Sequence, residues 1–85
     1  MVNEEKNKQF LAIKSMFLTG SVSRMKDIEK LYPTGVSKEL RLNHSRYIQK
    51  LYKPEEFKFK HIKDLSKLLN IDIQIILDVI IKELK

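Results

Sequence analysis

The stretch VSKELRLNHSRYIQKLYK, residues 36–53, decides the fold expected for this chain. Val36 and Leu40 lie four residues apart, as they do on one face of a short helix. The turn that follows ends at Asn43, a residue type that often caps the start of a helix, and the segment after it is rich in polar and basic side chains. The stretch therefore predicts two short helices joined by a few residues, with the second polar on its outer face.

The hydrophobic spacing of the remaining sequence predicts further helices. The six expected segments lie at about residues 3–18, 24–31, 35–40, 44–52, 60–69 and 73–84. With 85 residues, two glycines and two prolines, the composition favours one small helical domain over a sheet protein. We expect an all-α bundle of five to six helices, with an extra N-terminal helix in residues 1–20, a core in residues 24–72 and a C-terminal helix in residues 72–85.

Several kinds of chemistry lack the residues they require. The chain has no cysteine, so it has no disulfide or thiolate metal site. Its two histidines, His44 and His61, are not at metal-ligand spacing, and the glycines form no phosphate-binding loop. We therefore expect no metal, cofactor, small-molecule ligand or enzymatic activity. No apolar run is long enough to cross a membrane and the N-terminus is polar, so a cytoplasmic protein is expected.

The net charge of +6 is distributed unevenly. Residues 38–63 contain eight basic and three acidic side chains, a net charge of +5, whereas residues 1–37 carry +2 and residues 64–85 carry −1. Such a concentration is what a phosphate backbone would require, although a solvated lysine-rich surface has the same composition.

Residues 36–72 resemble the Cro/repressor-like (XRE-type) helix-turn-helix family. The matching positions are a small interior Ser37, a closing Leu40, the turn aliphatic Leu42, the cap Asn43, the inward aromatic Tyr47 and the later helix LSKLLNID, residues 65–72. Two positions depart from the family pattern. Arg41 stands in the turn where the family usually has glycine, and Lys50 stands where an apolar side chain is usual.

The resemblance implies a lambda-repressor-like fold and a sequence-specific double-stranded DNA-binding protein, a transcription regulator whose helix at about residues 44–52 reads the major groove. The implied base contacts are Asn43, His44, Ser45, Ile48 and Gln49. The implied phosphate contacts are Arg41, Arg46, Lys50, Lys53, Lys58 and Lys60. Arg41 also has a second interpretation as a plain surface residue. The alternative function is a protein-interaction module, adaptor or antitoxin-like, that keeps the fold without reading DNA.

The last segment, IQIILDVIIKEL, is apolar on most of its circumference if it is a helix. Ile73, Ile76, Leu77, Ile80 and Leu84 share one stripe, and Ile75, Val79 and Ile81 lie on other faces. Those three residues could be covered by a second copy in a homodimer, or by the N-terminal helix folding back with Phe10, Leu11 and Phe17. A β-strand is the other interpretation of so Ile-rich a run. Phe57 and Phe59, in the loop before residue 60, are expected to tuck under that loop.

Overall fold

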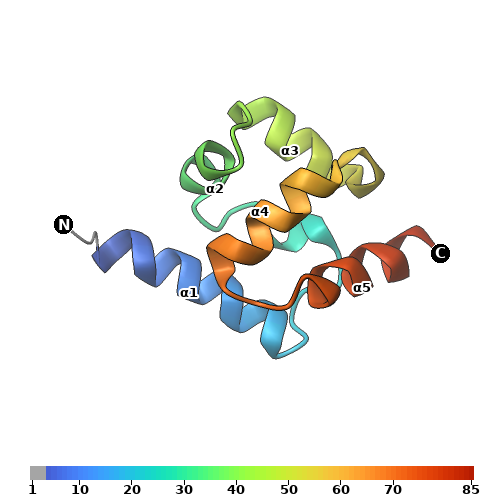
Figure 1. Ribbon diagram of the computed structural model, residues 1–85, viewed down its shortest axis with the longest axis horizontal. Coiled ribbons are helices and arrows are strands. Elements are labelled where there is room, and N and C mark those ends of the chain that lie inside the picture. The colour runs from blue at the N-terminus through green and yellow to red at the C-terminus, as the bar shows by residue number, and fades with distance from the viewer. Residues whose placement is uncertain (1–3) are drawn as a thin grey trace.

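Five α-helices and two 3-10 turns make up the protein in a computed structural model that describes residues 4–85, with side chains from residue 8 onward (Figure 1). The α-helices are α1 (Glu4–Leu18), α2 (Pro33–Glu39), α3 (His44–Tyr52), α4 (Phe59–Leu69) and α5 (Ile73–Leu84). The 3-10 turns are η1 (Met25–Ile28) and η2 (Pro54–Glu56). The all-helical bundle is confirmed, and the strand interpretation of the last segment is wrong, because the described residues contain no strand.

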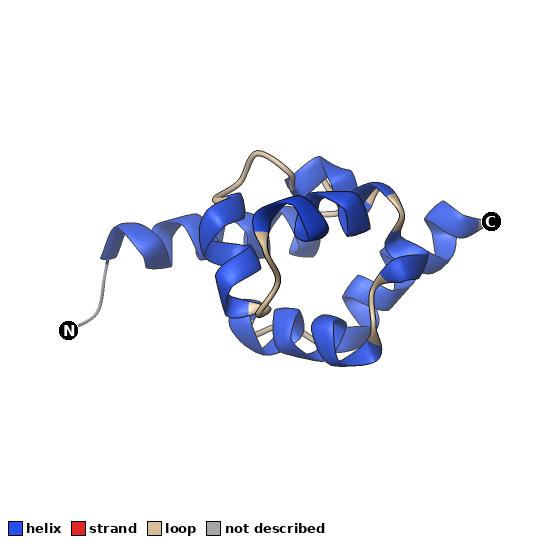
Figure 2. Ribbon diagram, turned by 90° about the horizontal axis from the view of Figure 1, so that it is seen from above, coloured by secondary structure: helices blue, strands red, loops and turns tan. Residues whose placement is uncertain are grey.

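Helix α4 lies at the centre of the bundle. It contacts α1, α2 and α5, while α2 and α3 pack against each other on one side (Figure 1). Figures 1 and 2 both show the beginning of α1 projecting from one end of the molecule and the C-terminus lying at the other end. Each α-helix contributes to a single core, whose most deeply buried large side chains are Ile13, Met25, Ile28, Val36, Leu40, Tyr47, Leu51, Leu65 and Ile76.

Three helices end in the same way, with one residue in the left-handed conformation. The residue is Gly20 after α1 (φ 76°), Arg41 after α2 (φ 59°) and Asn70 after α4 (φ 54°). Glycine adopts this conformation without strain and asparagine tolerates it, whereas a longer L side chain costs about 1 kcal/mol or more. Arg41 adopts this conformation despite its long side chain.

The segment before α2 differs from its expected form. Residues 24–31 are not an α-helix but contain only η1, whose start is capped by Asp27: its carboxylate accepts hydrogen bonds from the backbone N–H groups of Ser23 (2.9 Å) and Arg24 (3.0 Å). Asp27 is the third residue of η1, and a carboxylate at that position commonly caps the start of a helix.

Helix α2 begins two residues earlier than expected, at Pro33. Proline suits the first helical position because its missing N–H would have no partner there. The residue before it, Tyr32, takes the N-cap position with φ 49°, so Thr34 is inside the helix. The Tyr32 ring lies where a side chain at Gly35 would project, and it also contacts the ring of Phe10 at 5.6 Å between centroids. Only glycine fits beneath that ring.

Helix α5 is partly covered within one chain. Ile76 and Ile80 are buried, Ile75 and Val79 are half-buried, and α1 contacts α5 with Phe17 buried. The expected fold-back is thus present only in part: Phe17 lies beside Ile75 and Val79, whereas Phe10 packs against Tyr32 and Leu11 is 59% exposed. Two further residues stay exposed, because Ile81 and Leu84 are each 50% accessible; the inward position expected of Leu84 is wrong. The homodimer stays a prediction.

The two phenylalanines between α3 and α4 differ in how deeply they are buried. Phe57 is buried and meets the His61 ring edge-on at 6.4 Å, as expected for a residue closing the core. Phe59 is the first residue of α4 and is 66% exposed, so the expectation that it tucks under the loop is wrong. The 3-10 turn η2 shortens the loop and moves the start of α4 to Phe59.

Replacing Leu40 by alanine should lower the free energy of unfolding by about 2–5 kcal/mol, because a fully packed side chain would leave a cavity at the α2–α3 junction. Leu40 is 2% exposed. The control is Leu11→Ala, the same change at an exposed site, which should stay within about 0.5 kcal/mol of the wild type. Urea denaturation followed by circular dichroism measures both; equal midpoints would show that Leu40 does not anchor the core.

Candidate nucleic-acid interface

The turn between α2 and α3 is closed by two backbone hydrogen bonds. The Arg41 N–H donates to the Lys38 carbonyl (3.0 Å) and the Leu42 N–H donates to the Ser37 carbonyl (2.9 Å). This pair defines a Schellman motif with Arg41 at its left-handed position. Ser37 is buried, as expected of the small interior residue, and Leu42 packs against the core from the other side of the turn. The closure fixes the direction in which α3 leaves α2.

Helix α3 has the expected boundaries and the expected cap. The Asn43 side-chain oxygen accepts from the Arg46 backbone N–H at 2.8 Å, and the Ser45 hydroxyl donates to the same oxygen at 3.2 Å. Tyr47 and Leu51, four residues apart, are buried and hold the helix on the core. The opposite side of the helix then presents Ser45, Gln49 and, one turn further on, Lys53 to solvent.

Four of the five base-contact candidates are accessible. Asn43, His44, Ser45 and Gln49 are exposed, although the oxygen of Asn43 is already used by the cap. Ile48 is only partly exposed and packs against the core, so it lies at the edge of the outer face rather than on it. The accessible base-contact candidates are therefore all polar.

The basic candidates fall into two groups. Arg41, Arg46, Lys53, Lys58 and Lys60 are exposed. Lys50 is half-buried, and its amine donates to the Glu56 backbone carbonyl at 2.9 Å. The long aliphatic stem of lysine can cover apolar surface while its amine reaches a polar partner, which explains how a lysine occupies a position that is usually apolar in the family. Lys50 is thus engaged within the protein.

Glu56 was missed by the sequence analysis. Besides accepting from Lys50 through its carbonyl, it accepts from the Gln49 amide through its carboxylate, at 3.2 Å between Nε2 and Oε1. Arg46, Gln49, Lys50 and Glu56 line one shallow hollow. Glu56 lies seven residues after Gln49, beyond Pro54, so no helical periodicity could have paired them. The acid lies against the surface that was expected to be purely polar and basic.

The far end of α3 is tied to η1. The Tyr52 hydroxyl donates to the Glu29 carboxylate at 2.6 Å, and the Lys26 amine lies 5.6 Å from the centre of the Tyr52 ring. The hydrogen bond to Glu29 raises the pKa of Tyr52, so the phenol stays protonated and keeps donating. Capped at its start and held at its end, α3 is fixed along its whole length.

His61 is the third residue of α4 and lies among three lysines. It is buried, and its Nδ1 accepts the Lys58 backbone N–H at 3.2 Å, which closes the first turn of α4. Burial lowers the pKa of His61, and the positive charges of Lys50, Lys60 and Lys58 lower it further against a smaller opposite effect of Asp64. The imidazole is therefore neutral at neutral pH, with Nδ1 as a hydrogen-bond acceptor at the start of α4.

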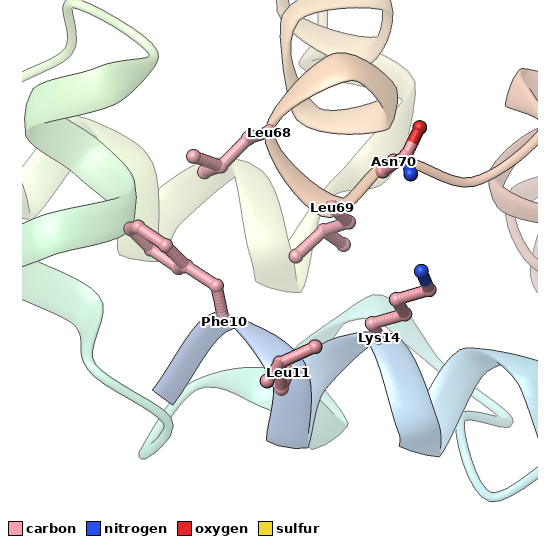
Figure 3. A pocket seen from close by; sticks show the side chains of 6 residues that line it. All are labelled: Phe10, Leu11, Lys14, Leu68, Leu69 and Asn70. Carbon is pink, nitrogen blue, oxygen red and sulfur yellow. The ribbon is translucent and has the colours of Figure 1, made fainter. Parts of the chain in front are cut away.

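A second hollow lies between α1 and the end of α4 (Figure 3). Its lining is Phe10, Leu11, Lys14, Leu68, Leu69 and Asn70. The lining offers one amine and one amide among apolar groups, with no cluster of acids or nucleophiles. Among residues 8–85, no group of three or more acidic or histidine side chains could hold a metal. No helix in the described part of the chain is long and apolar enough to cross a membrane.

No known protein family, curated protein or solved structure matches this chain significantly. The resemblance of residues 36–72 to the Cro/repressor-like family therefore rests on the sequence pattern.

The lowered pKa of His61 predicts a pH-dependent stability. Below the ordinary histidine pKa of 6.5 the unfolded chain binds a proton that the folded protein resists, so stability should fall as the pH decreases from about 7 to about 5. His61→Gln retains an acceptor for the Lys58 N–H and should flatten this dependence. Melting temperatures measured by circular dichroism across this range test it, with His44→Gln as the exposed control; an unchanged slope in His61→Gln would contradict the assignment.

Proposed function

We propose that this protein is a sequence-specific double-stranded DNA-binding protein, a transcription regulator that reads the major groove with α3. The observation that carries the proposal is the capped helix α3 on its closed turn, anchored by Tyr47 and Leu51 and presenting polar side chains outward. An α-helix with its side chains is about 10–12 Å across, so α3 fits a major groove about 12 Å wide.

Charge supports the same proposal. Arg46 and Lys53 flank the exposed side chain of Gln49 on α3, and the side chain of neither makes a hydrogen bond or ion pair within the part of the chain that the structure describes. Cations flanking a polar reading face are suited to the two phosphate backbones that border the groove. Lys58 and Lys60 add exposed charge at the start of α4. Lys50 contributes only its positive field, because its amine is held by Glu56.

Arg41 supplies a further argument. A non-glycine residue at φ 59° is strained, and such strain is concentrated at functional sites. Arg41 is exposed in the turn three residues before α3 begins, and it lines a shallow hollow together with Glu39, Asp64 and Lys67. We propose that its guanidinium reaches a phosphate beside the groove. Contact with that phosphate gives a reason for arginine at a position where glycine is less costly to the fold.

The proposal includes a homodimer. Small helix-turn-helix domains gain affinity by presenting two reading helices about one DNA turn apart. Ile81, half exposed on α5, with the partly exposed Ile75 and Val79, is the apolar surface that we propose for the contact. Titration of a duplex site to saturation should give two chains per site, and one chain per site would remove the dimer without removing DNA binding.

Wild-type protein should bind duplex DNA with an affinity that falls linearly on a log–log plot as salt rises. On a site selected from a random duplex pool, Gln49→Ala should lose about 1–3 kcal/mol and relax the base choice at one position. Lys53→Ala, one turn further along the same face, should weaken all sequences about equally and reduce the salt slope by about one. Fluorescence anisotropy measures all three proteins.

Absence of duplex binding at low salt would overturn the proposal. In that case a salt-independent interaction with a protein partner would favour the alternative, a helical protein-interaction module.

Arg41→Gly should have opposite effects on folding and binding. It should raise the free energy of unfolding by about 0.5–1 kcal/mol, because glycine removes the left-handed strain, and should weaken duplex binding by removing a phosphate contact. Arg41→Asn is the matched variant, because asparagine tolerates the same backbone and also lacks the charge. If Arg41→Asn binds DNA as tightly as the wild type, Arg41 is only a surface residue.

A further inference from the structure

Glu56 holds the outer face of α3 through two different groups. Its backbone carbonyl accepts from the Lys50 amine at 2.9 Å, which fixes η2 against the helix. Its carboxylate accepts from Nε2 of Gln49 at 3.2 Å. The backbone contact places the turn whatever side chain stands at residue 56, and the carboxylate then acts on Gln49 alone. These two functions can therefore be separated by substitution.

The contact with Glu56 defines what Gln49 can offer to a ligand. A glutamine side chain has one amide oxygen and two N–H groups, and its ends can exchange by rotation. A carboxylate only accepts hydrogen bonds, so it binds the nitrogen end and rejects the oxygen end. One N–H is taken by Glu56, and one N–H and the oxygen are left. An adjacent donor and acceptor is the pattern complementary to the major-groove edge of adenine, at N7 and N6.

The charge of Glu56 has a separate consequence. A carboxylate beside a DNA-binding surface is repelled by the phosphates, which are the same in every DNA sequence. It therefore lowers the affinity for all sequences equally and does not discriminate between bases. Glu55 precedes it in η2, carries the same charge and is exposed, and it makes no hydrogen bond to Gln49. Glu55 thus provides a control for charge without contact.

We propose that Glu56 is a positioning residue that sets the base preference of Gln49, by presenting the glutamine amide as a fixed donor and acceptor for adenine. The inference rests on the proposed DNA-binding function and deepens it. The carboxylate lowers affinity for all sequences and in return increases discrimination at the one base pair that Gln49 reads.

The experiment compares Glu56→Ala, Glu55→Ala and Glu56→Gln on the duplex site selected by the wild type and on the duplexes with each base pair substituted. The Gln49 position is defined as the one at which Gln49→Ala loses discrimination. Glu55→Ala should tighten binding to every duplex and keep the wild-type profile. Glu56→Ala should tighten binding to substituted duplexes and lose most of the expected discrimination at the Gln49 position, roughly tenfold for a good pair. Glu56→Gln keeps an acceptor oxygen and should retain most of the discrimination at the Gln49 position.

Two further measurements separate positioning from loss of structure. Adding Glu56→Ala to Gln49→Ala should change discrimination at that base pair no further, since the amide on which Glu56 acts is gone. The nuclear magnetic resonance signals of the Gln49 side-chain amide, recorded without DNA, should shift in Glu56→Ala and not in Glu55→Ala. If Glu56→Ala and Glu55→Ala have the same base-preference profile and the same Gln49 amide signals, the inference is overturned. Duplex binding by the wild type, and with it the proposed function, would be unaffected. Absence of a preferred site for the wild type would instead overturn the proposed function, and the base preference with it.

Discussion

The closure of the turn after α2 is the constraint on which the candidate interface depends. Two backbone hydrogen bonds, from Arg41 to Lys38 and from Leu42 to Ser37, reverse the chain within three residues and require a left-handed conformation at Arg41. The turn brings Leu40 and Leu42 against the core on either side, so α3 can leave only in one direction. With a different turn, Tyr47 would not reach the core, and the outer face of α3 would point elsewhere. The backbone geometry thus comes before any chemistry at the helix surface.

The remaining contacts of α3 hold a helix that could not be stable alone. Nine residues are too few for an isolated helix in water, so tertiary contacts must supply its stability. They act at three places: the Asn43 cap at the start, the buried pair Tyr47 and Leu51 in the middle, and the Tyr52–Glu29 hydrogen bond at the end. None of these contacts uses the side chains of Gln49, Arg46 or Lys53 for packing. Stability and surface chemistry are therefore divided between opposite faces of the same helix.

Features that depend on neighbours in the sequence could be predicted, and those that depend on distant contacts could not. The bounds of α3 and its Asn43 cap follow from side chains acting within a few residues. In η1, the Met25 N–H donates at 2.9 Å to the carboxylate of Glu83, which lies 58 positions away in the sequence. Likewise the Tyr32 ring fills the space above Gly35, and Glu56 reaches Gln49 across a proline. These pairs form only in the folded bundle, so the spacing of residues along the sequence does not predict them.

Contacts between distant residues also explain why a count of basic residues in the sequence overestimates the number of cations available to a partner. Residues 38–63 contain eight basic side chains, but the Lys50 amine is bound to Glu56. The lysine charges also act within the protein: burial lowers the pKa of His61, and the charges of Lys50, Lys60 and Lys58 lower it further, so the imidazole is neutral. A neutral His61 must stay an acceptor for the Lys58 N–H, so the start of α4 and the charge beside it are linked. An anion that binds these lysines would weaken the field that lowers the pKa of His61. Binding at this surface should therefore be coupled to protonation of a buried histidine that itself touches no ligand.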